Sequence, residues 1–123
     1  MRSFLKIIAV HIGLSVALAF PGALLAQAYP AQPIKLIVAF TSGTGSDILG
    51  RILAARLGEQ LVVPVTVENR AGAGGVVGTQ ALVKSPADGY TLTLATNATL
   101  ITSPLLSSKP PYRADKDFTP LGG

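Results

Sequence analysis

The chain has 123 residues, of which 49% are hydrophobic and 13% are charged, and its formal net charge is +4. This length fits at most one ordinary domain, and the hydrophobicity argues against a disordered chain. There is no Cys and a single His, His11. These counts exclude a disulfide framework and a metal–thiolate site, and they leave little material for a Ser-His-Asp triad.

Residues 1–28 have the features of a secretory signal. A short positive start precedes an apolar run of 14 residues from Ile7 to Phe20, and small residues before Tyr29 predict a cut between Ala28 and Tyr29. The run is shorter than the ~20 residues of a membrane-spanning helix, although an uncleaved membrane-anchoring helix is the alternative. We therefore expect an exported, periplasmic product that begins at Tyr29.

The charges of residues 29–123 are few and scattered. Eight basic residues stand against six acidic residues, which gives a net charge of +2. A nucleic-acid-binding protein typically has a clustered basic stripe, often with stacking aromatic residues. Neither is present, so we expect no nucleic-acid partner.

The first predicted unit is a strand followed by a helix. Residues 33–40 are almost continuously apolar, which is typical of a strand covered on both faces. After a break at 41–45, Ser46 is expected to cap a helix with Asp47 in its first turn, and Gly58 is expected to end it. Apolar residues at helical spacing predict its buried face: Ile48, Leu49, Ile52, Leu53 and Leu57.

A second strand is expected over 61–68, with pairing from Val65 because Pro64 cannot donate a ladder hydrogen bond. Four prolines after Asn97 argue against a long regular element in the last part of the chain. Between the second strand and this last part, the pattern predicts a loop at 69–75, a helix at 76–84, a turn at 85–89 and a strand at 90–95.

This β-α-β-α-β order predicts an α/β fold with a parallel sheet and right-handed crossovers. The loops at the carboxyl ends of parallel strands lie at one edge, where open α/β folds bind ligands. Here these loops are 41–46, 69–75 and 96–99, and they are rich in Gly, Ser, Thr and Asn. We therefore expect three polar loops to meet at one edge of the sheet.

Such an edge suits an anion, either a carboxylate or a phosphate. Glycines let backbone N–H groups approach a ligand, and a helix start directs several of them toward it. Hydroxyl groups in the first loop add further donors: Thr41, Ser42, Thr44 and Ser46.

The sequence offers little for catalysis, because no His or Cys follows residue 28. Asp47 is explained either as a first-turn helix acid or as a group acting through water or on a ligand ammonium, amide or hydroxyl. A small nucleotide-binding α/β enzyme is the alternative function, because Gly43-Thr44-Gly45 follows a strand and opens a helix. The third glycine of a dinucleotide fingerprint is replaced by Ile48, and we expect no cofactor.

Four ordered motifs in residues 29–121 point to a known family. They begin with Phe40-Thr-Ser-Gly-Thr-Gly-Ser-Asp47 and continue with Val67-Glu-Asn-Arg-Ala-Gly-Ala-Gly-Gly-Val-Val-Gly78, Asp88-Gly-Tyr-Thr-Leu92 and Lys116-Asp-Phe-Thr-Pro120. In these motifs the chain resembles the start of a Bug-type protein, the periplasmic receptor of tripartite tricarboxylate transporters. It departs from the family pattern at Ala39, Thr44 and Arg113, and Thr44 bears most directly on the ligand.

The resemblance implies a type II periplasmic-binding-protein fold, in which two α/β domains close on a small carboxylate-bearing solute. Residues 29–123 would be the N-terminal part of the first domain, with the second domain absent, so we expect a truncated chain that binds poorly alone. The implied function is a receptor, not an enzyme, which delivers its solute to the membrane permease subunits. The ligand-binding residues implied are Thr41, Ser42, Gly43, Thr44, Ser46, Asp47, Gly72, Ala73, Gly74, Gly75, Thr96 and Asn97.

Overall fold

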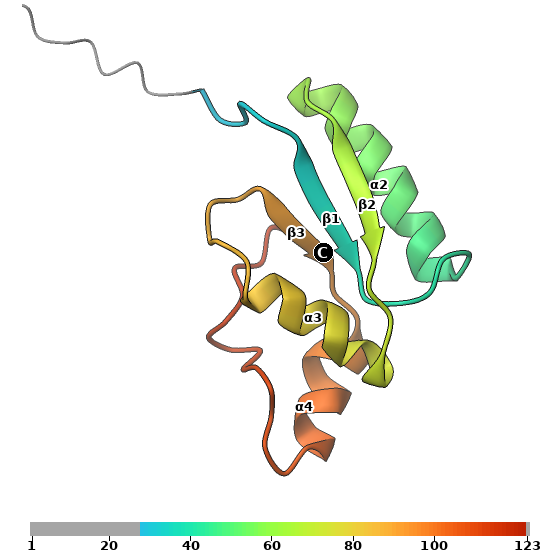
Figure 1. The fold of residues 1–123 in the computed structure, drawn as a ribbon, viewed down its shortest axis with the longest axis vertical. Coiled ribbons are helices and arrows are strands. Elements are labelled where there is room, and N and C mark those ends of the chain that lie inside the picture. Colours follow the sequence, from blue (N-terminus) through green and yellow to red (C-terminus); the bar gives the residue numbers. More distant parts are fainter. Residues whose placement is uncertain (1–27, 123) are drawn as a thin grey trace, which may run out of the picture.

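The computed structural model describes residues 28–122, so the predicted signal segment lies outside the described residues. Strands and helices alternate along this part of the chain, as the sequence predicts (Figure 1). No helix within it is long and apolar enough to span a membrane. The elements are β1 (Ile34–Val38), α2 (Gly45–Leu61), β2 (Val65–Asn69), η1 (Ala73–Gly75), α3 (Val76–Val83), β3 (Thr91–Leu94), η2 (Ala98–Thr102) and α4 (Ser103–Leu106).

The three strands form a parallel sheet in the order β2-β1-β3. In its register Leu36 lies between Val67 on one neighbour and Leu92 on the other. The predicted parallel sheet is therefore confirmed, including the start of β2 at Val65. Because all three arrowheads point the same way, the carboxyl ends of the strands share one edge (Figure 1).

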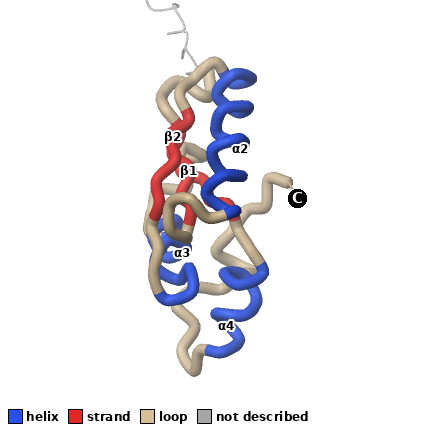
Figure 2. The backbone as a smooth tube through the Cα atoms, turned by 90° about the vertical axis from the view of Figure 1, so that its right-hand side faces the viewer, coloured by secondary structure: helices blue, strands red, loops and turns tan. Residues whose placement is uncertain are grey.

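The two longer helices cover opposite faces of this sheet (Figure 2). A Cβ atom at Gly50 of α2 would lie 2.7 Å from Val38 Cγ2, whereas one at Gly78 of α3 would lie 2.7 Å from the Ala39 Cα. Val38 is the last residue of β1, and Ala39 follows it directly. Both helices therefore approach the central strand closely, and almost all of its side chains are buried, Lys35 being the exception.

The buried face of α2 differs from the predicted one. Its buried residues are Asp47, Gly50 and Ala54. Of the large apolar residues expected to face the sheet, Leu57 is half-buried and the others are 37–57% exposed: Ile48, Leu49, Ile52 and Leu53. This expectation was wrong because α2 approaches the sheet so closely that only small residues fit between them.

Both predicted ends of α2 also need correction. The cap is Thr44 and not Ser46: Thr44 has an extended ψ of 164°, and its side chain accepts a hydrogen bond from the Asp47 N–H. The helix continues past Gly58 to Leu61, and Val62 ends it with a left-handed φ of 57°. A Cβ at Gly58 would lie 3.3 Å from the Val63 carbonyl, so the glycine provides room for the returning chain instead of ending the helix.

Replacing Val62 with Gly should stabilise the protein. Val62 is 87% exposed, so its side chain contributes little packing, while the left-handed backbone costs a residue with a Cβ about 1 kcal/mol. We expect Val62→Gly to raise the free energy of unfolding by roughly that amount in urea titrations. Val62→Ala, which keeps the Cβ, should gain less, and a loss of stability in Val62→Gly would contradict the expectation.

After β3 the chain is helical over residues 97–106, through η2 and α4. The four prolines argued against a long regular element after Asn97, and the two elements found there are short, with 5 and 4 residues. Pro104 is accommodated because it lies in the first turn of α4, where a missing N–H disrupts the helix least.

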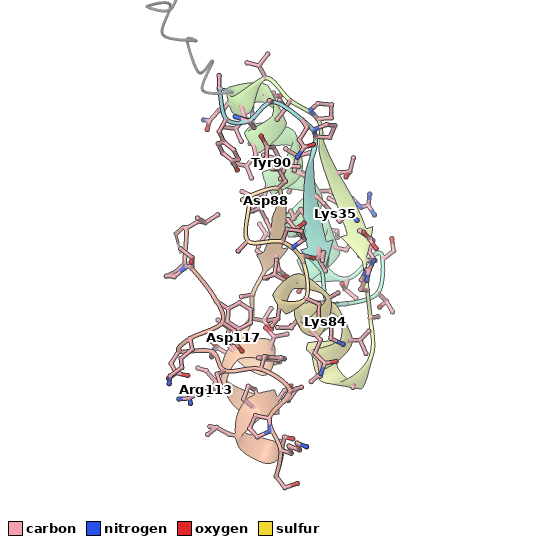
Figure 3. The ribbon with its side chains drawn as sticks, turned by 60° about the vertical axis from the view of Figure 1, so that its left-hand side comes forward. Lys35, Lys84, Asp88, Tyr90, Arg113 and Asp117 are labelled. Atoms are coloured by element: carbon pink, nitrogen blue, oxygen red, sulfur yellow. The ribbon has the colours of Figure 1, made fainter. Side chains whose placement is uncertain are left out.

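The start of the described chain is tied to the turn before β3. The Tyr29 hydroxyl donates to the Gly89 carbonyl at 2.7 Å, and the Ala31 N–H donates to the Tyr90 hydroxyl at 2.9 Å. The two tyrosine rings pack with their centroids 5.1 Å apart. Figure 3 shows Tyr90 and Asp88 at this turn, away from Arg113 and Asp117 near the end of the chain.

Candidate functional site

Three loops leave the shared edge of the sheet, as the strand order predicts. They follow β1, β2 and β3 and lead into α2, η1 and η2 respectively. A Cβ at Gly75 in the second loop would lie 2.6 Å from Thr99 and 3.4 Å from Phe40. The Ser103 hydroxyl also donates to the Gly74 carbonyl at 3.5 Å. The second and third loops therefore meet, and the first loop leaves the same edge of the sheet directly after Phe40.

The first loop is organised around the carboxylate of Asp47, whose residue is only 3% exposed. Its Oδ2 accepts hydrogen bonds from the Gly43 N–H at 2.9 Å, the Ser42 hydroxyl at 3.3 Å and Arg51 Nε at 3.1 Å. Its Oδ1 accepts from Asn69 Nδ2 at 2.9 Å and lies 3.1 Å from an Arg51 terminal nitrogen. Both oxygens are thus occupied by protein donors.

These donors favour the charged form of Asp47. The Arg51 guanidinium holds the pKa of the Asp47 carboxyl far below its ordinary value, and the Gly43 N–H and the Asn69 amide lower it further. Lys35 and Arg70 likewise lower the pKa of Glu68. Because Arg51 neutralises Asp47, the first loop presents backbone dipoles and hydroxyls without a net charge.

Stability should fall in acid because of these two carboxyl groups. A depressed folded-state pKa stabilises the fold above the ordinary unfolded pKa of about 4, and this stabilisation is lost as the pH falls through the folded-state pKa. Between about pH 5 and pH 8, we expect the contribution of Asp47 and Glu68 to the free energy of unfolding to stay nearly constant. Below about pH 4 this contribution should decline. Urea titrations should show a shallower acid decline in Asp47→Asn, and an unchanged decline would contradict this assignment.

The hydroxyls of the first loop divide into two groups. Thr44 donates to the Thr41 carbonyl at 2.8 Å, and Ser42 donates to Asp47. Thr44 is thus committed to its own loop as the helix cap. Within residues 28–122, no hydrogen-bond partner is found for the Thr41 and Ser46 hydroxyls, so both are available to a ligand.

The second loop has four consecutive residues with positive φ, from Gly72 to Gly75, and of these only Ala73 carries a Cβ. Glycine tolerates such a backbone, which explains the composition of the loop. The Gly75 N–H donates to the Gly72 carbonyl at 2.9 Å. For the Ala73 and Gly74 N–H groups, no backbone acceptor is found in the described part of the chain. Consecutive unpaired N–H groups of this kind form an anion-binding concavity.

The third loop is held by reciprocal bonds between two threonines. The Thr96 N–H donates to the Thr99 hydroxyl at 3.0 Å, and the Thr99 N–H donates to the Thr96 hydroxyl at 3.3 Å, as in a capping box. The buried Tyr112 hydroxyl donates to the Thr99 carbonyl. Asn97 is exposed, and its side chain has no hydrogen-bond partner among the described residues.

Three residues that support these loops were not in the predicted set: Arg51, Asn69 and Tyr112. Asn69 lies in the glycine-rich motif, so its position beside the second loop could have been found from the sequence. Its contact with Asp47, 22 residues away, depends on strand order and side-chain direction. Nothing in the sequence pairs Tyr112 with Thr99.

A hollow of about 580 Å³ lies at the other edge of the sheet, between the end of α2 and the start of β2. Its lining is mainly apolar and contains no basic side chain, so it offers little to an anion. Within residues 28–122 no cluster of three potential metal ligands occurs. The loop edge is therefore the candidate site.

Comparison with protein families matches residues 49–122 to the tripartite tricarboxylate transporter family receptor, TctC. The chain belongs to this receptor family. The match covers more than half of the chain and includes the second and third loops. Members of the TctC family are solute-binding receptors, which are not a class of enzymes.

Individual members support the same assignment. Protein BugT of Bordetella pertussis (strain Tohama I / ATCC BAA-589 / NCTC 13251) is 47% identical over 97 residues, which are 78% of this chain and 30% of BugT. The periplasmic binding protein BugD is 35% identical with a TM-score of 0.73, covering 76% of this chain and 31% of BugD. MatC from Rhodopseudomonas palustris with bound malate is 33% identical with a TM-score of 0.71, and the match covers 75% of this chain and 31% of MatC.

The chain therefore spans about 30% of the length of the TctC relatives it matches. It corresponds to the N-terminal portion of a Bug/TctC receptor, and residues 28–122 have part of the periplasmic-binding-protein fold.

Proposed function

We propose that residues 29–122 form one side of the binding site of a periplasmic receptor for a small carboxylate-bearing solute. The observation that carries this proposal is the meeting of three amide-rich loops at the carboxyl edge of one parallel sheet. Unpaired N–H groups in the second loop and at the start of α2 provide donors suited to a carboxylate. The bound malate of the related MatC supports a solute of this class.

The donors expected to contact the solute are those not already used within the protein. They are the hydroxyls of Thr41 and Ser46, the N–H groups of Gly45, Ala73 and Gly74, and the side chain of Asn97. Ser42, Gly43, Thr44, Gly72, Gly75 and Thr96 shape the loops that carry them. In the intact receptor a second domain would close over this edge, and the receptor would deliver the solute to the permease subunits after removal of a leader at Ala28.

Titration of malate into the chain tests the proposal. Binding to one side of a site should be weak, on the order of 1 mM, so NMR chemical shifts of backbone amides are a suitable measurement. We expect the changes to concentrate at residues 41–46, 72–75 and 96–97. Changes only at the hollow near Val62, or none at high millimolar malate, would contradict the proposal, and tighter binding of ADP or NAD would favour the nucleotide-binding alternative.

Gly45→Ala provides a matched variant. A Cβ at Gly45 meets no atom within 4 Å, so the fold should tolerate it, whereas a ligand at the start of α2 would meet it directly. We expect malate binding to weaken roughly tenfold while the unfolding midpoint remains unchanged. Arg56→Ala, on the exposed surface of the same helix, should change neither quantity.

A further inference from the structure

Asn69 connects the first two loops through a single side chain. It is the last residue of β2, and the second loop begins immediately after it. Its Nδ2 donates to the Phe40 carbonyl at 3.1 Å and to Asp47 Oδ1 at 2.9 Å, while its Oδ1 accepts from Arg51 at 3.3 Å. All three polar functions of the amide are therefore used, which neither an aspartate nor an apolar residue could reproduce.

Arg51 and Asp47 complete this arrangement from α2. Arg51 lies one helical turn after Asp47 and contacts both carboxylate oxygens as well as Asn69. Asp47 in turn holds the Gly43 N–H and the Ser42 hydroxyl of the first loop. The contacts thus run from the first loop, through Asp47, to the end of β2.

We propose that Asp47, Asn69 and Arg51 act as a positioning cluster that sets the first two ligand loops relative to each other, with Asp47 acting through the protein and not on the solute. This inference rests on the proposed function for the role of the loops. Asp47 is nearly inaccessible, and five protein donors surround its two oxygens. A free ligand-binding carboxylate would instead retain unused acceptor sites toward solvent.

NMR of the solute-free chain tests the cluster independently of binding. We expect Asn69→Ala to move the amide signals of both 42–45 and 72–75 and to accelerate hydrogen exchange of the Gly43 amide at least tenfold. The control Arg56→Ala should move neither group. Signals at 42–45 that stay in place in a folded Asn69→Ala chain would overturn the proposal.

Asn69→Asp gives a readout that a purely structural role would not produce. It places a second carboxylate where Asn69 Nδ2 now lies 2.9 Å from Asp47, so one of the two should bind a proton at a raised pH. We expect the signals at 42–45 to become pH dependent between about pH 4 and pH 7, whereas those of the native chain stay constant. Constant signals in Asn69→Asp would overturn the proposal.

Malate binding separates this proposal from the function on which it rests. Ser46→Ala removes a free hydroxyl, so it should weaken malate binding without moving the solute-free loop signals. Asn69→Ala should weaken malate binding and should also move the solute-free loop signals. If the loop signals respond as expected and the native chain does not bind malate, the positioning cluster stands and the proposed function falls.

Discussion

Gly78→Ala should lower the free energy of unfolding by about 3 kcal/mol, because α3 has no room for a Cβ where it crosses β1. The added atom would lie 2.7 Å from the Ala39 Cα and 2.7 Å from the Arg70 carbonyl. Both are backbone atoms of the residues that directly follow β1 and β2, so no side-chain rotation can relieve the overlap. Urea unfolding followed by circular dichroism measures the loss.

The sign of this effect distinguishes packing from helix propensity. Within a helix, Ala is normally favoured over Gly by about 1 kcal/mol, so an effect of propensity alone would stabilise the variant. Gly45→Ala is the control, since its Cβ would meet no atom within 4 Å, and it should change stability by less than about 0.5 kcal/mol. Equal stability of Gly78→Ala and the native chain would show that α3 does not pack on Ala39 as described.

Tyr112→Ala should cost about 3 kcal/mol and loosen the third loop. Tyr112 is 3% exposed, packs edge-on against Phe118 with ring centroids 5.7 Å apart and donates to the Thr99 carbonyl. The truncation removes this packing and leaves a buried carbonyl without its donor. Thermal unfolding measures the stability, and amide exchange at Thr99 measures the loop.

Two variants separate the contributions of Tyr112. Tyr112→Phe keeps the ring and loses only the hydrogen bond, so it should cost about 1 kcal/mol. Leu106→Ala removes an apolar side chain that is 82% exposed and should have almost no effect. Similar losses in Tyr112→Ala and Leu106→Ala would contradict the anchoring role of Tyr112.

The order of elements and the position of the loop edge could be predicted because both follow from local patterns. Alternating strands and helices favour a parallel sheet, and Pro64 marked the start of β2. The orientation of α2 could not be predicted in the same way. Hydrophobic periodicity predicts that large residues such as Ile48 and Ile52 face the sheet. The close contact of α2 with Val38 instead requires Gly50 at that face.

The helix cap and the supporting residues depended on information that spacing does not contain. Ser46 and Thr44 are both good capping residues, and the extended backbone at Thr44 decides between them. Asn69 and Tyr112 reach residues distant in the sequence, and those contacts exist only after the sheet has formed. The sequence thus predicted the loops of the candidate site better than the side chains that hold them.

The attachment of Tyr29 has a consequence for the order of maturation. Its hydroxyl and ring bind the turn at Gly89 and Tyr90, so the peptide bond after Ala28 lies directly beside the folded body. A processing protease requires an extended stretch of chain on both sides of the bond that it hydrolyses. If the chain is cleaved at the junction predicted from the sequence, between Ala28 and Tyr29, we therefore expect the cleavage to come before Tyr29 docks on Gly89 and Tyr90.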